Sequence, residues 1–329
     1  MYIPPIEEYN EKYEYDSIEE KPFPGLEFPA FHIKGLRFIN AENKEVKHIS
    51  GQSFLVSAAS LFYHSMIDTV GHYELLKSQY PDLNIRFCTR DEHTDFKKHV
   101  MLNDTQATDV LHLYEDPYNV WEILDLVNKN YSFEEVIFLP NQGPTYSYRM
   151  IPKDIQESLP YTWPDLVPIR VEASKHLKNK FKDKLIKTEP KKIYSARKQY
   201  KPGVQIDPSR MYDAEDKIIE YFIDKGYEIV NLKGMSLIDQ FNLFYNASEI
   251  AGIKGTNLFC SIFAEPETKV IQIYNSGFWR YDFEQYFNAH GLKPIDIAQE
   301  DAKQLPHDPD APLLSAGIII QRLKEYFED

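Results

Sequence analysis

Cysteine is nearly absent from this sequence, and no long apolar run stands near its start. Two cysteines, Cys88 and Cys260, occur among 329 residues, each inside an apolar segment. No disulfide framework is therefore expected, and both thiols are expected to be buried as small apolar groups. Residues 1–21 are acidic and contain proline, without the apolar core of a signal peptide or a membrane anchor. These absences predict a soluble protein in a reducing, cytoplasmic compartment.

Positive charge is also scarce. The sequence has 37 Lys and Arg residues against 51 Asp and Glu residues, which gives a net charge of −14. This balance argues against nucleic acid or an anionic membrane as the main partner, so any phosphate site has to be local. Three N-x-[ST] triplets begin at Asn103, Asn130 and Asn246. Without a secretory signal they are interpreted as chance matches.

Short apolar segments alternate with amphipathic ones along most of the sequence. Strands are predicted at 31–39, 46–49, 54–56, 84–89, 135–139, 192–196, 227–232, 249–253 and 270–274. Helices are predicted at 61–79, 118–128, 163–187, 214–225, 258–263 and 316–327, with a further helix capped by Ser236. This alternation indicates an α/β fold with a mostly parallel sheet, and the length favours two domains. The predicted domains are 1–188, with an extended N-terminal arm, and 189–329.

The segment 246–274 carries the clearest candidate for a binding site. It is predicted to form a strand at 249–253, the polar turn Lys254-Gly255-Thr256-Asn257, and then a helix at 258–263. A helix N-terminus offers unpaired N–H groups, Gly255 allows close backbone approach, and Lys254 adds a positive charge. A phosphate or diphosphate would fit there. Spacing alone favours an ordinary strand-to-helix connection, because the turn has no P-loop or dinucleotide fingerprint.

Five motifs in a fixed order connect this turn to a known family. They are Tyr194-Ser195-Ala196-Arg197, Gly226-Tyr227-Glu228-Ile229, Ser236-Leu237 with Gln240, Ala247-Ser248 followed by Gly252-Ile253-Lys254-Gly255-Thr256-Asn257-Leu258, and Phe263 with Pro266, Thr268 and Val270-Ile271. In these motifs the chain resembles glycosyltransferase family 61, which contains plant xylosyl- and arabinosyltransferases and eukaryotic O-linked N-acetylglucosaminyltransferases. Two positions depart from the family pattern. Lys254 stands where the family has His, and Gln272 stands where it often has Glu.

The resemblance implies a GT-B-like architecture, in which two Rossmann-like domains face each other across a cleft. It also implies an inverting transfer from a nucleotide-sugar donor. The implied donor-binding residues are Ser195, Arg197, Gln240, Lys254, Gly255, Thr256, Asn257 and Gln272. Arg197 would hydrogen-bond the donor diphosphate through its planar guanidinium, whereas without the resemblance a surface arginine is an equally good interpretation. The helix at 316–327 would pack back on the N-terminal domain.

The helix predicted at 61–79 carries the candidate catalytic residues. Its apolar face comprises Phe62, Met66, Val70 and Tyr73. His64, Asp68 and His72 recur every four residues and share another face. This resembles an H-x-x-x-D segment of the family, which implies that His64, oriented by Asp68, or an ionised carboxylate deprotonates the acceptor hydroxyl. Two alternatives stay open: a helix-surface pair worth roughly 0.2 to 0.5 kcal/mol, and a zinc site, for which no third close ligand is evident.

No metal or other cofactor is expected. The D-x-D match Asp308-Pro309-Asp310 lies in a proline-rich loop with no strand before it, and is interpreted as a turn. Leaving-group charge would be met by Lys254, Arg197 and backbone N–H groups. The sequence therefore predicts a hexosyl- or pentosyltransferase that acts on a hydroxyl of a glycan or glycoconjugate. Two classes stay open beside it: a catalytically inactive sugar- or nucleotide-binding protein of the same fold, and another phosphate-ligand enzyme on a doubly wound sheet.

Overall fold

The chain forms two compact units, each with its own sheet. A computed structural model describes residues 13–22, 29–39, 45–57, 65–82, 84–89, 123–125, 130–138, 163–196, 215–232, 234–275, 281–299 and 315–328. Unit 1 is Met1–Lys180 and unit 2 is Phe181–Asp329, whereas the sequence places the boundary after residue 188. The predicted α/β class is confirmed, because helices accompany parallel and antiparallel strands.

Unit 1 contains a mixed sheet. Its strands are β1 (Tyr13–Glu14), β2 (Ser17–Pro22), β3 (Pro29–Lys34), β4 (Arg37–Phe38), β5 (Val46–Ser57), β6 (Asn84–Thr89), β7 (Ile123–Asp125) and β8 (Asn130–Phe138). The order is β1-β4-β8-β5-β6-β7, and β3 pairs with both β8 and β2. β5 runs parallel to β8 and β6, and β6 parallel to β7. The strands β1, β2, β3 and β4 make only antiparallel pairings within the described residues. Unit 1 therefore does not contain the mostly parallel sheet that the sequence predicts.

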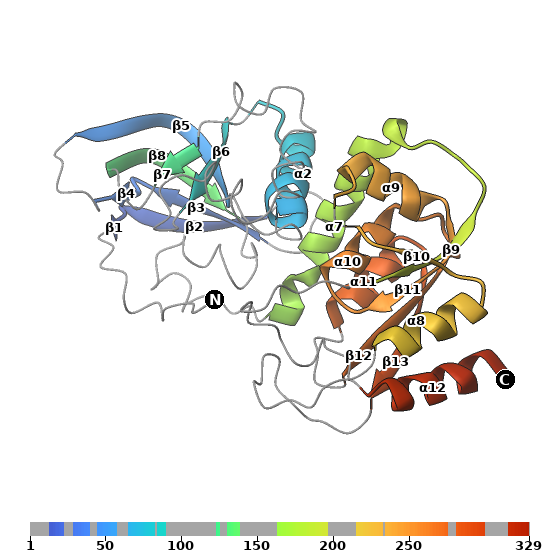
Figure 1. The fold of residues 1–329 in the computed structure, drawn as a ribbon. Coiled ribbons are helices and arrows are strands. Elements are labelled where there is room, and N and C mark those ends of the chain that lie inside the picture. Colours follow the sequence, from blue (N-terminus) through green and yellow to red (C-terminus); the bar gives the residue numbers. More distant parts are fainter. Residues whose placement is uncertain are drawn as a thin grey trace. The chain divides into compact units, whose positions relative to one another are not determined.

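Two helices cover one face of this sheet. They are α2 (His72–Gln79) and α7 (Trp163–Phe181), which share an apolar core with three strands (Figure 1). That core comprises Ala30, Phe54, Leu75, Leu76, Ile137, Ile169 and Ala173. Because side chains of a strand alternate between faces, the neighbours Phe31, Leu55 and Val136 lie in a second core on the opposite face.

The prediction of a helix at 118–128 is wrong for the three residues that the structure describes there. Ile123–Asp125 form β7, which pairs in parallel with β6. The run Val120-Trp121-Glu122-Ile123-Leu124 is short and apolar, so its periodicity fits a buried strand as well as a helix. Pairing with a neighbouring strand decides between the two.

The helix predicted at 61–79 is not uniform. A π-helical segment, η2 (Ser65–Gly71), precedes α2. A π-helix turns by a smaller angle per residue than an α-helix, so the faces assigned from α-helical spacing shift along this segment. His72, expected on the polar face, is fully buried, and its Nδ1 donates to the carbonyl of Ile67 at 2.8 Å.

Unit 2 is built around a five-stranded parallel sheet. Its strands are β9 (Lys191–Ser195), β10 (Glu228–Val230), β11 (Ala247–Ile253), β12 (Lys269–Asn275) and β13 (Lys293–Gln299), in the order β10-β9-β11-β12-β13. Its helices are α8 (Glu215–Asp224), α9 (Leu237–Tyr245), α10 (Thr256–Phe259), α11 (Tyr281–Ala289) and α12 (Ala316–Glu328), with the 3-10 turns η4 (Lys182–Lys184) and η6 (Cys260–Phe263).

Local sequence signals set the ends of two helices in unit 2. Gly226 follows α8 with a φ of 80°, the left-handed conformation that glycine adopts without strain. Ser236 caps α9, because its Oγ accepts from the backbone N–H of Asp239 at 3.1 Å. Both ends agree with the sequence prediction.

Helices lie on both faces of the unit 2 sheet. α8 and α12 cover one face, and α9, α10 and α11 lie on the other (Figure 1). Tyr194, Ala251 and Ile271 face α8 and α12 in one apolar core. α12 buries Ala316, Ile319 and Leu323 in the same core, so its apolar face is covered within unit 2.

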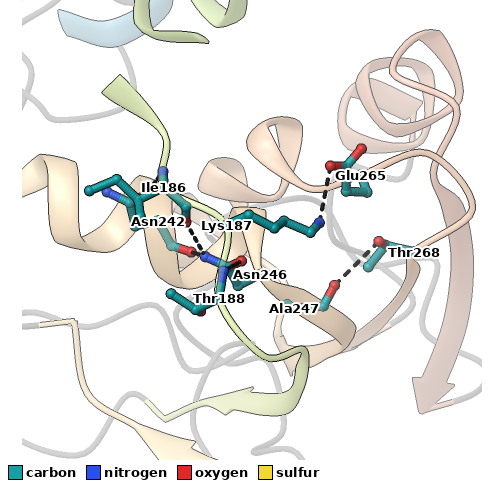
Figure 2. A network of polar contacts seen from close by, with 8 residues as sticks. All are labelled: Ile186, Lys187, Thr188, Asn242, Asn246, Ala247, Glu265 and Thr268. Atoms are coloured by element: carbon teal, nitrogen blue, oxygen red, sulfur yellow. Dashed lines mark hydrogen bonds and ion pairs between the residues drawn. The ribbon is translucent and has the colours of Figure 1, made fainter. Parts of the chain in front are cut away.

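The segment that follows η4 is fixed to α9, as Figure 2 shows. Asn242 Oδ1 accepts from Ile186 N at 2.6 Å, and Asn246 Oδ1 accepts from Thr188 N at 2.6 Å. Asn246 Nδ2 donates to Ile186 O at 2.8 Å. The spacing fits because four residues along a helix and two along an extended chain both cover roughly 6 Å. Lys187 lies over the Tyr245 ring and pairs with Glu265 at 3.1 Å, so every residue from 186 to 188 is held.

The structure describes two properties that the composition addresses: the burial of a cysteine, and the length and apolar character of the helices. Cys260 is buried, as predicted, and burial raises the pKa of its thiol to about 12. Across the described parts of the chain, no helix combines the length and apolar character needed to cross a membrane.

Candidate functional site

The strand order of unit 2 reverses at β9. β10 lies on one side of β9, and β11, β12 and β13 lie on the other. In doubly wound parallel sheets, ligands bind beyond the carboxyl ends of the strands at such a switch point. β9 ends at Ser195, which lies opposite Gly252 near the end of β11. The turn that begins at Lys254 follows β11 directly, so the predicted site residues of both strands meet at the switch point.

Asn257 bridges the two strand ends. Its Nδ2 donates to Ser195 Oγ at 3.2 Å and lies 3.4 Å from Ser195 O. Gly252 leaves the necessary room, because a Cβ there would lie 3.1 Å from both Ser195 O and Leu258 Cδ2. Ser195 and Asn257 come from separate sequence motifs and are brought together by the fold.

Lys254 is fully buried beside aromatic rings. Its Nζ lies 4.9 Å from the ring centroid of Tyr274 and 6.0 Å from that of Phe283. The backbone N–H of Lys254 donates to Ile273 O at 2.8 Å, so the residue continues the alternation of β11. Its side chain therefore shares a face with Gly252. Cation–π attraction fixes the ammonium group on this face.

The helix after the turn is shorter and starts earlier than predicted. α10 is a single turn that begins at Thr256 with Gly255 as its N-cap, and it continues as the 3-10 turn η6. A helix dipole grows with the number of aligned peptide units, so one turn contributes less to anion binding than the sequence implied. Thr256 is exposed and Gly255 is buried. The positive charge of this turn comes mainly from Lys254.

Gln272 lies in the same row of the sheet as Ser195 and Gly252. Gly252 pairs with Gln272 across β11 and β12, and Gln272 pairs with Asp296 across β12 and β13. The Nε2 of Gln272 donates to Asp296 Oδ1 at 3.2 Å. Ser195, Gly252, Gln272 and Asp296 therefore form a polar row that crosses the sheet close to the carboxyl ends of its strands.

Gln240 makes a different set of contacts. Its buried Nε2 donates to Met235 O at 3.1 Å and lies 3.4 Å from Leu232 O. It ties the connection between β10 and α9 to the first turn of α9. The contacts described for Gln240 are those of a loop support, and none of them involves the Lys254 turn.

Several predicted residues fall outside what the structure describes. Arg197 and His64 are outside the described residues, as is the Asp308-Pro309-Asp310 motif. Asp68 lies in η2, where the backbone is described. The structure therefore leaves the catalytic assignment as it was predicted from the sequence.

Sequence reasoning missed three residues of the site. They are Asp296, Tyr274 and Phe283. The alternation Ile295-Asp296-Ile297-Ala298 predicts a strand, and recognising it as the neighbour of β12 would have suggested a polar partner for Gln272. Tyr274 was predicted as the end of a strand, but its position over Lys254 depends on sheet pairing.

The parallel sheet of unit 2, in this strand order and with helices on both faces, defines a doubly wound α/β unit. In this class of fold, ligands bind beyond the carboxyl ends of the strands. The chain belongs to glycosyltransferase family 61, because the model of this family, described as Glycosyltransferase 61, matches residues 62–271. The resemblance seen in the motifs is thereby confirmed. A search among curated proteins gave no match.

Membership of the family implies glycosyltransferase activity, and hence a sugar donor and an acceptor as substrates. The matched region includes Ser195, Gly252, Lys254 and Asn257, which form the bridge and the turn at the switch point. Gln272 is the first residue beyond its end, and Asp296 lies further along the chain. The site built from unit 2 is therefore largely within the part that is common to the family.

Proposed function

We propose that this glycosyltransferase is an inverting enzyme of GT-B-like architecture. It transfers a hexosyl or pentosyl group from a nucleotide sugar to a hydroxyl of a glycan or glycoconjugate, and it works in the cytoplasm. Unit 2 binds the donor, and unit 1 carries the residues that act on the acceptor. The single observation that supports this proposal most is the hydrogen bond between Asn257 and Ser195 at the switch point, next to Lys254.

The donor diphosphate sits at the carboxyl ends of β9 and β11. Lys254 supplies positive charge, and the N–H groups of Gly255 and Thr256 are further donors. Arg197, two residues after the end of β9, adds a planar guanidinium. As the bond to the sugar breaks, negative charge grows on the diphosphate, and these groups stabilise it without a divalent metal.

The transfer is a single displacement at C1 of the sugar. The acceptor oxygen forms a bond to C1, the bond between C1 and the diphosphate oxygen breaks, and the configuration at C1 inverts. The acceptor proton moves to a general base, for which His64, oriented by Asp68, or Asp68 itself is proposed. The bonding electrons leave with the nucleoside diphosphate.

A thermal-shift panel of nucleotides and nucleotide sugars tests donor binding. Ligand at 100 times its dissociation constant stabilises the native state by about 2.7 kcal/mol, so the preferred nucleotide raises the melting temperature. Lys254→Met keeps the aliphatic stem and removes the charge, and it should lose most of this shift. Lys217→Met is the matched control, since Lys217 is exposed on α8. An equal shift in both variants would refute the phosphate role of Lys254.

Product formation tests the reaction itself. His64→Ala and Asp68→Ala should each lower the transfer rate while nucleotide binding is kept, because the base acts on the acceptor. Full activity in both variants contradicts the proposed base. Nucleotide binding without product from any donor would favour the alternative, a catalytically inactive sugar- or nucleotide-binding protein of the same fold.

A further inference from the structure

The polar row of unit 2 has a defined direction. Ser195, Gly252, Gln272 and Asp296 are paired neighbours on four adjacent strands. Paired residues of a parallel sheet point to the same face, which here is the face of α10 and α11. Ser195 and Gln272 are fully buried. Buried polar groups in a sheet need hydrogen-bond partners, so the partners of this row reveal its purpose.

Asp296 determines which way the carboxamide of Gln272 is turned. A glutamine amide can present either its oxygen or its NH2 group, and only the hydrogen-bond network distinguishes the two. A carboxylate has acceptor oxygens and no donor. It therefore binds the NH2 group of Gln272, at the observed distance of 3.2 Å, and turns the carbonyl oxygen away from itself.

The carbonyl oxygen of Gln272 is the part of the amide that Asp296 does not bind. Gln272 Oε1 is buried and accepts no hydrogen bond from the residues that the structure describes. A buried acceptor without a partner is costly, so a donor group that reached it would bind favourably. A phosphate oxygen is itself an acceptor and would be repelled there. Lys254, two residues beyond Gly252 on the same face, suits phosphate instead.

We propose that Asp296 is a positioning residue that makes Gln272 present a hydrogen-bond acceptor to the donor substrate. The substrate group bound by Gln272 is then a hydroxyl or an N–H of the nucleoside, and not a phosphate. This inference rests on the proposed function, in which unit 2 binds a nucleotide sugar. It divides the site into a phosphate region at Lys254 and a nucleoside region at Gln272.

The test exchanges the two polar groups. Asp296→Asn has the same shape but can donate to Gln272 Oε1, which occupies the acceptor or lets the amide turn over. In the double variant Gln272→Glu/Asp296→Asn, the carboxylate introduced at position 272 accepts from the NH2 introduced at position 296 and keeps an oxygen for the ligand. Gln272→Met, which has similar volume and no polar group, removes the acceptor by a different route. Melting temperatures of all variants report whether they fold.

The readout is the difference between two probes, measured by titration calorimetry. One probe is the nucleoside diphosphate that stabilises the wild type most, and the other is inorganic diphosphate. Asp296→Asn and Gln272→Met should each lower the affinity for the nucleoside diphosphate by roughly fivefold to tenfold, which is the effect of losing one hydrogen bond. In both variants the affinity for inorganic diphosphate should stay within about twofold of the wild-type value. The double variant should restore the binding of the nucleoside diphosphate.

Three results would overturn the inference. If Asp296→Asn weakened the binding of both probes equally, or if the double variant failed to restore binding while it remained folded, Asp296 would have a structural role only. A wild type that bound no nucleoside diphosphate would overturn the proposed function and the inference with it. The first two results leave donor binding by the wild type intact and the third does not, so the failure of the inference and the failure of the proposed function are distinguishable.

Discussion

Asn257 donates from its Nδ2 to the hydroxyl of Ser195 over 3.2 Å, although the two residues are 62 positions apart in the sequence. The bond joins the first turn after β11 to the last residue of β9. It therefore holds the turn that follows Lys254 against the end of β9 at the switch point. The proposed diphosphate site depends on the position of this turn, which makes the bond a sensitive place to test.

Asn257→Ala should release the turn from β9 without unfolding the protein. Loss of one hydrogen bond of this kind costs about 1 kcal/mol of unfolding free energy. Nucleotide binding should weaken by more than the stability loss explains, because the turn is no longer held against β9. Calorimetric titration and urea unfolding measure the two effects. Asn288→Ala, at an exposed position of α11, is the control and should change neither.

Gly252→Ala tests the close approach of β9, β11 and α10. The added Cβ would lie 3.1 Å from Ser195 O and from Leu258 Cδ2, which is closer than side chains normally pack. Crowding of this kind costs about 1–3 kcal/mol. Unfolding in urea should show this loss, and the Asn257 bridge should shift outward, so that nucleotide binding falls too. A variant as stable as the wild type would show that the strands separate easily.

Asn246 and Asn242 allow a graded test of the segment fixed to α9. Asn246 accepts from Thr188 N and donates to Ile186 O and Asn242 O, whereas Asn242 makes one contact to the segment, at Ile186 N. Asn246→Ala should therefore lower the unfolding free energy by about 1–3 kcal/mol, and Asn242→Ala by less. Equal losses would contradict the unequal roles.

Because the Asn246 amide is fully engaged and the residue is buried, the triplet that starts there is closed to modification in the folded chain.

Glu135 provides a pH test in unit 1. Burial would raise the pKa of this carboxyl, but hydrogen bonds from His32 at 2.8 Å and Gln52 at 2.7 Å lower it below the ordinary value of 4.5. A group with a lowered folded-state pKa stabilises the protein above its unfolded-state pKa, and this contribution is lost as the pH falls through the folded-state pKa. At pH 7 the wild type should thus have a higher free energy of unfolding than Glu135→Gln. This difference in unfolding free energy should shrink below pH 4.5. A constant difference would exclude the carboxylate as its source. Glu20→Gln, at an exposed position of β2, is the matched control.

Short-range signals predicted much of unit 2. Ser236 and Gly226 mark helix ends through their own side chain or backbone conformation, so the sequence reveals them directly. Lys254 is predicted as a site residue because its turn connects a strand to a helix N-terminus, and Ser195 is implied by the resemblance to the family. Both lie at the switch point in the structure.

Long-range pairing explains what the sequence did not reveal. The run around Ile123 fits two periods, and its pairing with β6 makes it a strand. The antiparallel strands of unit 1 are set by contacts between β3, β4 and β8, which no local pattern encodes. Asp296 lies 24 residues from Gln272, and only the register of β12 and β13 makes them partners. His72 is buried although the sequence pattern places it on a polar face, and a π-helical segment precedes it.

Hydrogen–deuterium exchange with the preferred nucleotide sugar tests the central claim most directly, because it locates the donor on the chain. The account predicts slower exchange of backbone N–H groups at the end of β9, around Ser195, and in the turn from Lys254 to Asn257. Exchange in β1 to β4 of unit 1 should stay unchanged when no acceptor is present. Binding that protected unit 1 and left both strand ends of unit 2 unaffected would contradict the account.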